Sequence, residues 1–176
     1  MRMKQGDDAA DRLAHAKGDR PAMLHQLLKL TNRLMAPFST HLAHRYRISL
    51  NEFRLLMVIG ALGRTASHEL AELTGVNVMS VSRAVATLER HGRLEIKPDP
   101  SNRRRKWLTL TEEGQRLYAA MYPQSEKVAN YLFSELSEQE INQLDRIVER
   151  LISTLEAKDA DGNSLFLEMT KPEGDS

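Results

Sequence analysis

Two short helical segments separated by a turn at Gly75 constrain this 176-residue chain more than any other feature. The second segment begins near Asn77 and ends at His91-Gly92, so the spacing is that of a helix-turn-helix. Gly75 lies where such a turn needs a residue that tolerates a positive φ. Ala71 lies where the first helix must approach the second closely, and Val81 lies where the second helix packs back. Three further apolar residues complete the predicted interior: Leu70, Val76 and Val85.

The outer face of the second helix carries side chains that are available to solvent or to a nucleic-acid groove. An ordinary helical hairpin with a solvated face is the alternative interpretation of the same pattern. The candidate groove residues are Asn77, Met79, Ser80, Ser82, Arg83 and Thr87.

A basic loop between two short apolar segments follows directly. Leu94 and Ile96 before the loop, and Trp107 to Leu110 after it, have the pattern of paired strands. The three arginines and one lysine at 103–106 have no purpose in packing a core. Arginine suits a narrow, negatively charged minor groove because its guanidinium is weakly hydrated. The sequence therefore predicts a hairpin that contacts DNA, and a solvated loop is the alternative.

Charge divides along the chain although the formal net charge is only +1. Residues 77–106 hold eight basic and three acidic side chains, whereas residues 111–157 hold four basic and nine acidic ones. A basic middle followed by an acidic C-terminal third indicates that one segment meets a polyanion. The chain has no cysteine, which excludes a disulfide framework, a thiolate nucleophile, a cysteine zinc site and a thiol redox sensor.

Two other classes of protein lack their sequence signals. There is no Gly-x-Ser-x-Gly elbow and no phosphate-cradling glycine-rich loop, so an enzyme is not expected. No apolar run approaches the roughly 18–20 residues that span a bilayer, and the N-terminus lacks a signal-peptide stretch, so we expect a cytoplasmic protein. A helical protein-interaction module stays an alternative, although it leaves the basic loop unexplained.

Amphipathic helices are predicted on both sides of this central region. The apolar residues of 20–47 recur at three- and four-residue steps, and Pro37 is expected to bend or interrupt that helix. Pro123 is expected to kink the helix that follows the hairpin. Residues 158–176 are mostly polar and are expected to be largely mobile. The predicted helix caps are Ser49 with Glu52, Thr65 or Ser67, Thr111, and Ser137 with Glu140.

The central region resembles the MarR family of winged helix-turn-helix regulators. The resemblance covers residues 49–117 and is carried by Ala71, Gly75 and Val81, by Ser82-Arg83, and by the loop 99–106 followed by Trp-Leu-Thr-Leu-Thr-Glu-Glu-Gly. It implies a mostly α fold with a small β-hairpin wing, in which N- and C-terminal dimerisation helices flank the DNA-binding lobe. It also implies a bacterial or archaeal transcription factor, commonly a repressor, that leaves double-stranded DNA when a small molecule binds.

Carried over residue by residue, the resemblance makes 78–90 the recognition helix, with Ser80, Ser82 and Arg83 near bases or phosphates. The family usually has an aspartate before the paired wing arginines, and this chain has Asn102 there. Arg93 and Ile96 also depart from the family pattern, with a charge where an aliphatic residue is common and an aliphatic residue where arginine is common. The predicted wing residues are Asn102, Arg103, Arg104, Arg105 and Lys106.

The resemblance also implies an effector pocket between the dimerisation helices and the DNA-binding lobe. An aromatic carboxylate needs a cation or donor for its acid group and an apolar slot for its ring. A solvated arginine is the alternative for each cationic candidate. His41 and His44 share a helix face and could chelate a metal or titrate near neutral pH, but we expect no metal and no cofactor. The candidate effector residues are His41, His44, Arg45, Arg54 and Tyr118.

These expectations define a homodimer that binds a pseudo-palindromic operator and is released by a small aromatic acid of a catabolic pathway. Regulation of drug or stress response is the alternative within the same family. The expected division is a mobile arm at 1–19, a dimerisation helix at 20–47, the DNA-binding lobe at 48–111, C-terminal dimerisation helices at 112–157 and the tail at 158–176. The expected dimer residues are Leu24, Leu27, Leu28, Ile141, Leu144, Val148, Leu151 and Leu155.

Overall fold

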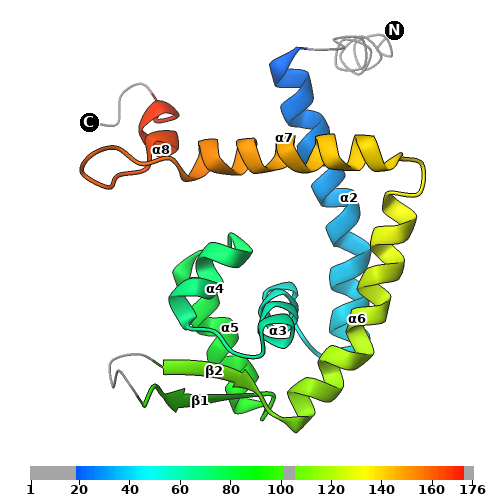
Figure 1. Ribbon diagram of the computed structural model, residues 1–176, viewed down its shortest axis with the longest axis vertical. Helices are drawn as coiled ribbons and strands as arrows, with labels where there is room; N and C mark the ends of the chain where they lie inside the picture. Colours follow the sequence, from blue (N-terminus) through cyan, green and yellow to red (C-terminus); the bar gives the residue numbers. More distant parts are fainter. Residues whose placement is uncertain (1–18, 101–105, 173–176) are drawn as a thin grey trace, which may run out of the picture. The chain divides into compact units, whose positions relative to one another are not determined.

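A computed structural model describes residues 19–100 and 106–172, without the side chains of 37–39, 41 and 43. The chain divides between Tyr122 and Pro123 into two compact units. The first unit contains α2 (Arg20–Tyr46), α3 (Leu50–Leu62), α4 (Ser67–Thr74), α5 (Val78–Arg90), β1 (Leu94–Pro98), β2 (Lys106–Leu110) and the first part of α6 (Glu112–Leu132) (Figure 1). The second contains the rest of α6, α7 (Glu138–Glu156) and α8 (Leu165–Met169).

The helix-turn-helix interior is confirmed. Gly75 ends α4 in the left-handed region with φ +63°, and α5 begins three residues later. Leu70 and Val81 are buried between the two helices, and Ala71 is partly buried against the same core. A residue with a Cβ is strained at the Gly75 backbone conformation, so glycine here sets the angle at which α4 meets α5. The core continues through Leu55, Leu56, Ile59, Val76, Val85, Leu88 and Leu108.

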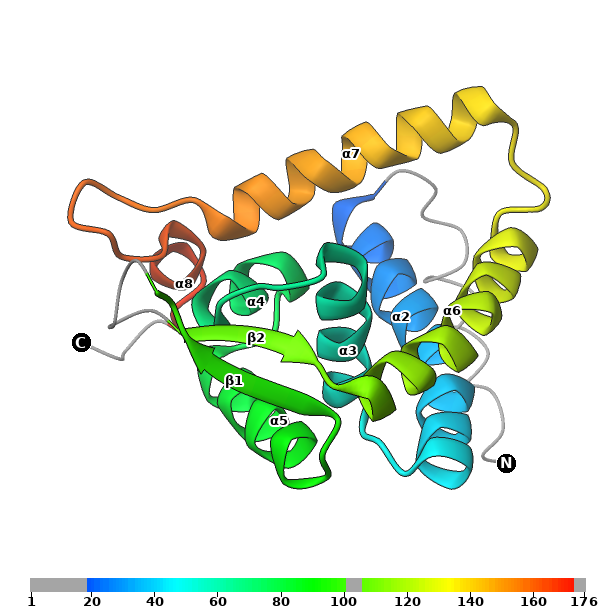
Figure 2. The same cartoon turned by 60° about the horizontal axis from the view of Figure 1, so that its bottom comes forward.

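The predicted hairpin is also confirmed. Strands β1 and β2 pair antiparallel, with Leu94 opposite Leu110 and Pro98 opposite Lys106. Figure 2 shows the two strands side by side above α5. Thr65, from the connection between α3 and α4, adds a bridge to the other side of β2, with hydrogen bonds of 3.1 and 2.8 Å to Leu108. The hairpin is therefore tied to the helical core as well as to itself.

Most of the predicted helix caps are present. The Ser49 and Ser137 side chains each accept a backbone N–H in a complete capping box, and Thr111 Oγ1 accepts from Gly114 N at 3.1 Å. The prediction for α4 is wrong, because neither Thr65 nor Ser67 accepts a capping hydrogen bond. Ala66 is the N-cap residue instead. The carboxylate at N3 of this helix, Glu69 Oε2, accepts from Ala66 N at 2.8 Å and from Thr65 Oγ1 at 2.9 Å.

Pro37 was expected to bend or interrupt its helix, and the interruption does not occur, because α2 is continuous from Arg20 to Tyr46. Proline removes one hydrogen bond from the helical ladder, and a 27-residue helix retains the bonds on either side of it. Pro123 likewise lies inside α6 without ending it.

The tail, which we expect to be largely mobile, contains a turn and a short helix. Lys158 bridges to Ser164, Asp159 Oδ1 accepts from Asn163 N at 2.8 Å, and α8 follows. Hydrogen bonds from Asn163 and neighbouring backbone N–H groups lower the pKa of Asp159. A turn held by its own aspartate and a helix capped by Ser164 supply local order that polar composition alone does not reveal. The arm at 1–18 and residues 173–176 lie outside the described residues.

Within residues 19–100 and 106–172, no helix is long and apolar enough to cross a bilayer. The same described residues contain no group of three or more histidine, cysteine, aspartate or glutamate side chains that is placed to hold a metal ion.

Candidate nucleic-acid interface

The outer face of α5 is polar and accessible. Ser82 and Arg83 are exposed, Ser80 and Thr87 are half-buried, and Met79 is 66% exposed. The opposite face holds Val81, Ala84, Val85 and Leu88 in the core, so the helix cannot rotate without losing that burial. The sequence pattern therefore predicted correctly which side of the helix faces outward.

Asn77 has a structural task in this arrangement. It is the N-cap of α5, and its Oδ1 accepts from Ser80 N at 2.9 Å. A capping side chain of this kind satisfies one of the N–H groups that a helix leaves without a partner in its first turn. The Asn77 oxygen accepts the capping N–H, and the amide NH2 remains available to donate outward.

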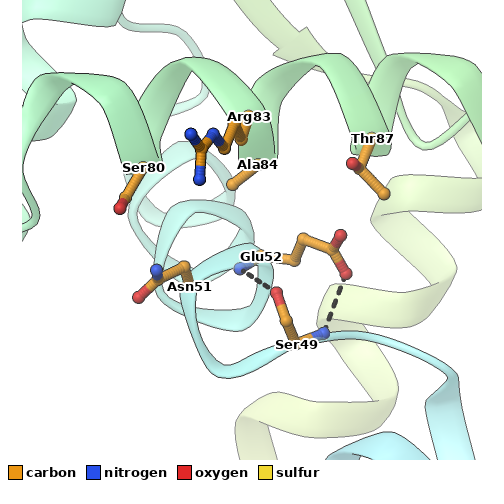
Figure 3. Close-up of a pocket in the computed structure, with 7 residues that line it drawn as sticks. All are labelled: Ser49, Asn51, Glu52, Ser80, Arg83, Ala84 and Thr87. Atoms are coloured by element: carbon orange, nitrogen blue, oxygen red, sulfur yellow. Dashed lines mark hydrogen bonds between the residues drawn. The ribbon is translucent and has the colours of Figure 1, made fainter.

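A cavity of about 270 Å³ lies between α5 and the start of α3. Figure 3 shows the Arg83 side chain extending from α5 above the first turn of α3, with Ser80 and Thr87 along the same helix. Ser49, Asn51 and Glu52 line the α3 side. The cavity is polar and combines a guanidinium with hydroxyl and amide groups, the side-chain chemistry that binds phosphate oxygens and base edges.

Glu52 lines the same cavity but forms no ion pair with Arg83. Its Oε2 accepts from Ser49 N at 2.8 Å, and Ser49 Oγ accepts from Glu52 N at 3.2 Å, so the carboxylate is held in the capping box. Arg83 has no hydrogen bond or ion pair with any other residue in the described part of the chain. Its five N–H donors are consequently available to a ligand of opposite charge.

The structure describes the base of the predicted wing. Lys106 is exposed at the start of β2, whereas Asn102, Arg103, Arg104 and Arg105 lie outside the described residues. At the base, the Arg64 guanidinium stacks over the Trp107 ring with its carbon 4.7 Å from the ring centroid. This cation was not among the predicted residues, because the pattern of 61–66 gave no sign that this connection reaches the hairpin.

The Glu95 carboxylate of β1 accepts hydrogen bonds from its own strand and from β2. Lys97 Nζ lies 2.7 Å from Glu95 Oε1, and Thr109 Oγ1 donates to the same oxygen at 3.1 Å. The hydrogen bond from Lys97, followed by that from Thr109, lowers the pKa of Glu95. The ionised Glu95 carboxylate therefore stabilises the folded hairpin at pH values above the ordinary pKa of a glutamate. This stabilisation is lost as the pH falls through the lowered pKa.

The predicted effector residues lie in different surroundings. His44 is exposed, and Arg45 is exposed with its guanidinium carbon 5.7 Å from the Tyr46 ring centroid. Arg54 donates to Asn51 Oδ1 at 3.3 Å and to Met35 Sδ at 3.7 Å. The Tyr118 ring packs against Gly60, where a Cβ would overlap it, and lies 5.6 Å from the Tyr122 ring. The side chain of His41 is outside the described residues.

Every residue predicted for a dimer interface is exposed within the single chain. Leu24, Leu27 and Leu28 on α2 are 58, 41 and 53% exposed. On α7, the exposed fractions run from 38% at Leu144 to 51% at Leu155, and no residue of this helix is buried. Ile147 and Ile152 widen the same apolar stripe beyond the predicted set of Ile141, Leu144, Val148, Leu151 and Leu155.

Val78 is a further exposed residue that the sequence pattern did not single out. It is the first residue of α5 and is 70% exposed, next to Met79. Two apolar side chains at the outward start of a helix can contact the methyl group of thymine in a major groove. Met79 was among the predicted groove residues, whereas Val78 was assigned neither to the groove face nor to the core.

Comparisons with known proteins agree with this geometry. The MarR family profile matches residues 48–106. The chain is 29% identical over 147 residues to the transcriptional repressor MprA of Escherichia coli strain K12, covering 78% of this chain and 83% of that protein. Proteins of the MarR family regulate transcription and are not enzymes, in line with the sequence expectation.

Solved structures share the fold. A MarR/EmrR family transcriptional regulator from Acinetobacter sp. ADP1 superposes with a TM-score of 0.70 at 25% identity, covering 76% of this chain and 94% of that one. BpsR of Bordetella bronchiseptica, whose DNA binding is regulated by 6-hydroxynicotinic acid, gives a TM-score of 0.63 at 21% identity over 73% of this chain and 97% of that one.

Proposed function

Because this chain belongs to the MarR family of winged helix-turn-helix transcriptional regulators, we propose that it is a repressor that binds a pseudo-palindromic operator as a homodimer and is released by a small aromatic acid. The observation that carries the DNA-binding part is the outer face of α5. There Arg83 is exposed and lacks a partner among the described residues, between two half-buried hydroxyl residues, Ser80 and Thr87. Repression is supported by the similarity to MprA, which is named as a repressor.

The homodimer is supported by the uncovered apolar stripe on α7. Seven large aliphatic residues of one helix are each more than a third exposed, which is costly for a chain that stays alone in water. A second copy offers an identical stripe, and a two-fold interface is self-complementary. The two recognition helices would then enter successive major grooves roughly 34–36 Å apart, which requires an operator with matching half-sites.

The effector class is supported by chemistry and by one structural neighbour. BpsR responds to 6-hydroxynicotinic acid, a heteroaromatic carboxylate. In this chain, Arg54 lies half-buried beside Met35 of α2, which places a guanidinium next to an apolar thioether. A cation of this kind can bind a carboxylate while the thioether contacts a ring. Screening aromatic acids for release of bound DNA tests this part separately.

The DNA-binding proposal is tested by the substitution Arg83→Ala. We expect affinity for operator DNA to fall by about 1–3 kcal/mol if Arg83 makes a bidentate base contact, with a much smaller loss on scrambled DNA. Fluorescence anisotropy, titrated from low to moderate salt with DNA from upstream of the protein's own gene and with a scrambled duplex, measures both values. Equal losses on the two duplexes would identify a phosphate contact instead.

Arg90→Ala is the matched control, because it removes an exposed arginine from the last turn of the same helix. It should change affinity less than Arg83→Ala does. Wild-type protein that shows neither salt-sensitive binding nor a preference for any upstream sequence would contradict the proposed function, because phosphate contacts make protein–DNA affinity fall steeply with salt.

The dimer is tested by Val148→Glu in the middle of the α7 stripe. A carboxylate placed there cannot be buried without a partner, so we expect monomers in solution and a loss of operator affinity. Light scattering during size-exclusion chromatography measures the mass, and circular dichroism checks that helices remain. Glu149→Gln, one residue along on α7, is the control and should stay dimeric. A Val148→Glu protein that remains a dimer would place the interface elsewhere.

A further inference from the structure

Arg93 joins three elements of the first unit. It lies in the turn between α5 and β1, and its guanidinium donates to Tyr46 O at 3.1 Å and to Arg47 O at 3.2 Å, at the C-terminal end of α2. Its main chain donates to Leu88 O in α5 at 2.9 Å and accepts from Thr111 N, just before α6, at 3.2 Å. One residue therefore bonds to the end of α2, to the last turns of α5 and to the start of α6.

The carbonyl groups that Arg93 binds are chemically suited to a cation. The last carbonyls of an α-helix lack N–H partners within the helix, and the helix dipole makes this end negative. Arg47 also adopts a left-handed conformation with φ 52° and is the one non-glycine residue with positive φ in the described chain. Such a conformation is uncommon for arginine, and a hydrogen bond to its carbonyl helps to hold it.

The start of α6 is packed closely against the turn between α5 and β1, where Arg93 lies. A Cβ added to Gly114 would overlap the main-chain oxygen of Arg93, and Thr111 Oγ1 donates to Gly92 O at 2.6 Å. Figure 2 shows the end of α5, the start of α6 and the chain leaving α2 on the same side of the lobe. A shift of the α2 end is consequently passed through the Arg93 side chain to a backbone that is fixed to α5.

We propose that Arg93 is a positioning residue for DNA binding, which fixes the C-terminal end of α2 to the end of the recognition helix. The inference rests on the proposed DNA-binding function of α5 and adds a route by which movement of α2 alters the pose of that helix. In this proposal Arg93 acts through α5, since its guanidinium donates to the carbonyls of Tyr46 and Arg47 and its main chain is bonded to α5. An aliphatic side chain at 93 could pack in this junction but could not bind the end of α2.

The first test measures the coupling without DNA. The chain has no cysteine, so cysteines introduced at exposed Lys29 on α2 and Glu89 on α5 can carry spin labels, with excess unlabelled protein used to isolate distances within one chain. We expect a narrow distance distribution in the parent, a broader or shifted one in Arg93→Ala, and an intermediate one in Arg93→Lys, whose ammonium can bind a carbonyl without the arginine fork. An unchanged distribution in Arg93→Ala, in protein that melts cooperatively, would overturn the inference.

The second test measures operator affinity and its dependence on salt. Arg93→Ala should bind operator DNA about tenfold more weakly, with the slope of affinity against salt unchanged, and Arg93→Lys should recover part of the loss. If the slope of log affinity against log salt concentration became smaller by about one, Arg93 would be a phosphate contact and the inference would be overturned. Equal affinity of wild type and Arg93→Ala would also overturn it and leave the proposed function intact. Wild type that binds no DNA removes the proposed function, and the label distances then still decide whether Arg93 couples α2 to α5.

Discussion

Replacing Gly114 by alanine is expected to lower the free energy of unfolding of the first unit by about 1–3 kcal/mol or more. The new Cβ would overlap the Arg93 main-chain oxygen and lie 3.2 Å from the Leu110 Cβ. A backbone oxygen cannot move aside as the end of a flexible side chain can. Relief therefore requires the start of α6 to separate from the turn between α5 and β1, which breaks the Thr111 N hydrogen bond to Arg93 O.

Urea unfolding followed by circular dichroism measures this loss, and Gln115→Ala is the control. Gln115 is the next residue of α6 and is exposed, so alanine there removes no buried contact and should be nearly neutral. Because alanine favours a helix more than glycine does, an exposed Gly→Ala change would normally stabilise it. A Gly114→Ala protein at least as stable as the wild type would show that the junction relaxes easily.

Leu88→Ala is expected to cost about 2–5 kcal/mol, because Leu88 is fully buried on the core side of α5 and its removal leaves a cavity. The substitution leaves every outward residue of the helix unchanged. Operator affinity should nevertheless fall at temperatures near the lowered melting point, because only the folded lobe binds. Differential scanning calorimetry, with anisotropy measured well below the transition and close to it, separates the two effects.

The control for this prediction is Glu89→Ala, one residue along and exposed. It should have little effect on the melting temperature. If Leu88→Ala had the same melting temperature as the wild type, the burial of Leu88 between α5 and the rest of the first unit would be contradicted. If its affinity were lost far below the transition, the core would set the pose of α5 as well as its stability.

The central fold could be predicted because each local signal agreed with the next. Gly75 supplied the turn, Leu70 and Val81 supplied the facing apolar positions, and the alternation around Leu108 supplied a strand. All of these depend on spacing within about forty residues. Signals that agree over a short range leave few competing folds.

Contacts between distant segments could not be predicted in the same way. The bonds from Arg93 to Tyr46 and Arg47 span 46 or 47 positions, and no periodicity marks an arginine that binds a carbonyl far back in the chain. The sequence showed only that Arg93 is a charged residue at a position where the MarR family commonly has an aliphatic one. Arg64 over Trp107 is a second contact of this type.

The candidate site was predicted as a surface, but the task of each residue was not. Asn77 and Arg83 both lie on the outward side of the helix-turn-helix, yet one caps α5 and the other has no partner among the described residues. The difference depends on a backbone N–H in reach of one side chain and on a Glu52 carboxylate already bound elsewhere. Neither fact is visible in residue types.

The bridge between Thr65 and Leu108 has a consequence for association between copies. A strand whose hydrogen-bonding groups face water can pair with the same strand of another molecule, which leads to aggregation. Thr65 occupies part of one edge of β2, and β1 covers the other. The outer edge of β1 carries Lys97 and ends at Pro98, which has no N–H to donate. The small sheet is thus protected at its edges, so that concentrated protein should associate through helices and not through strands.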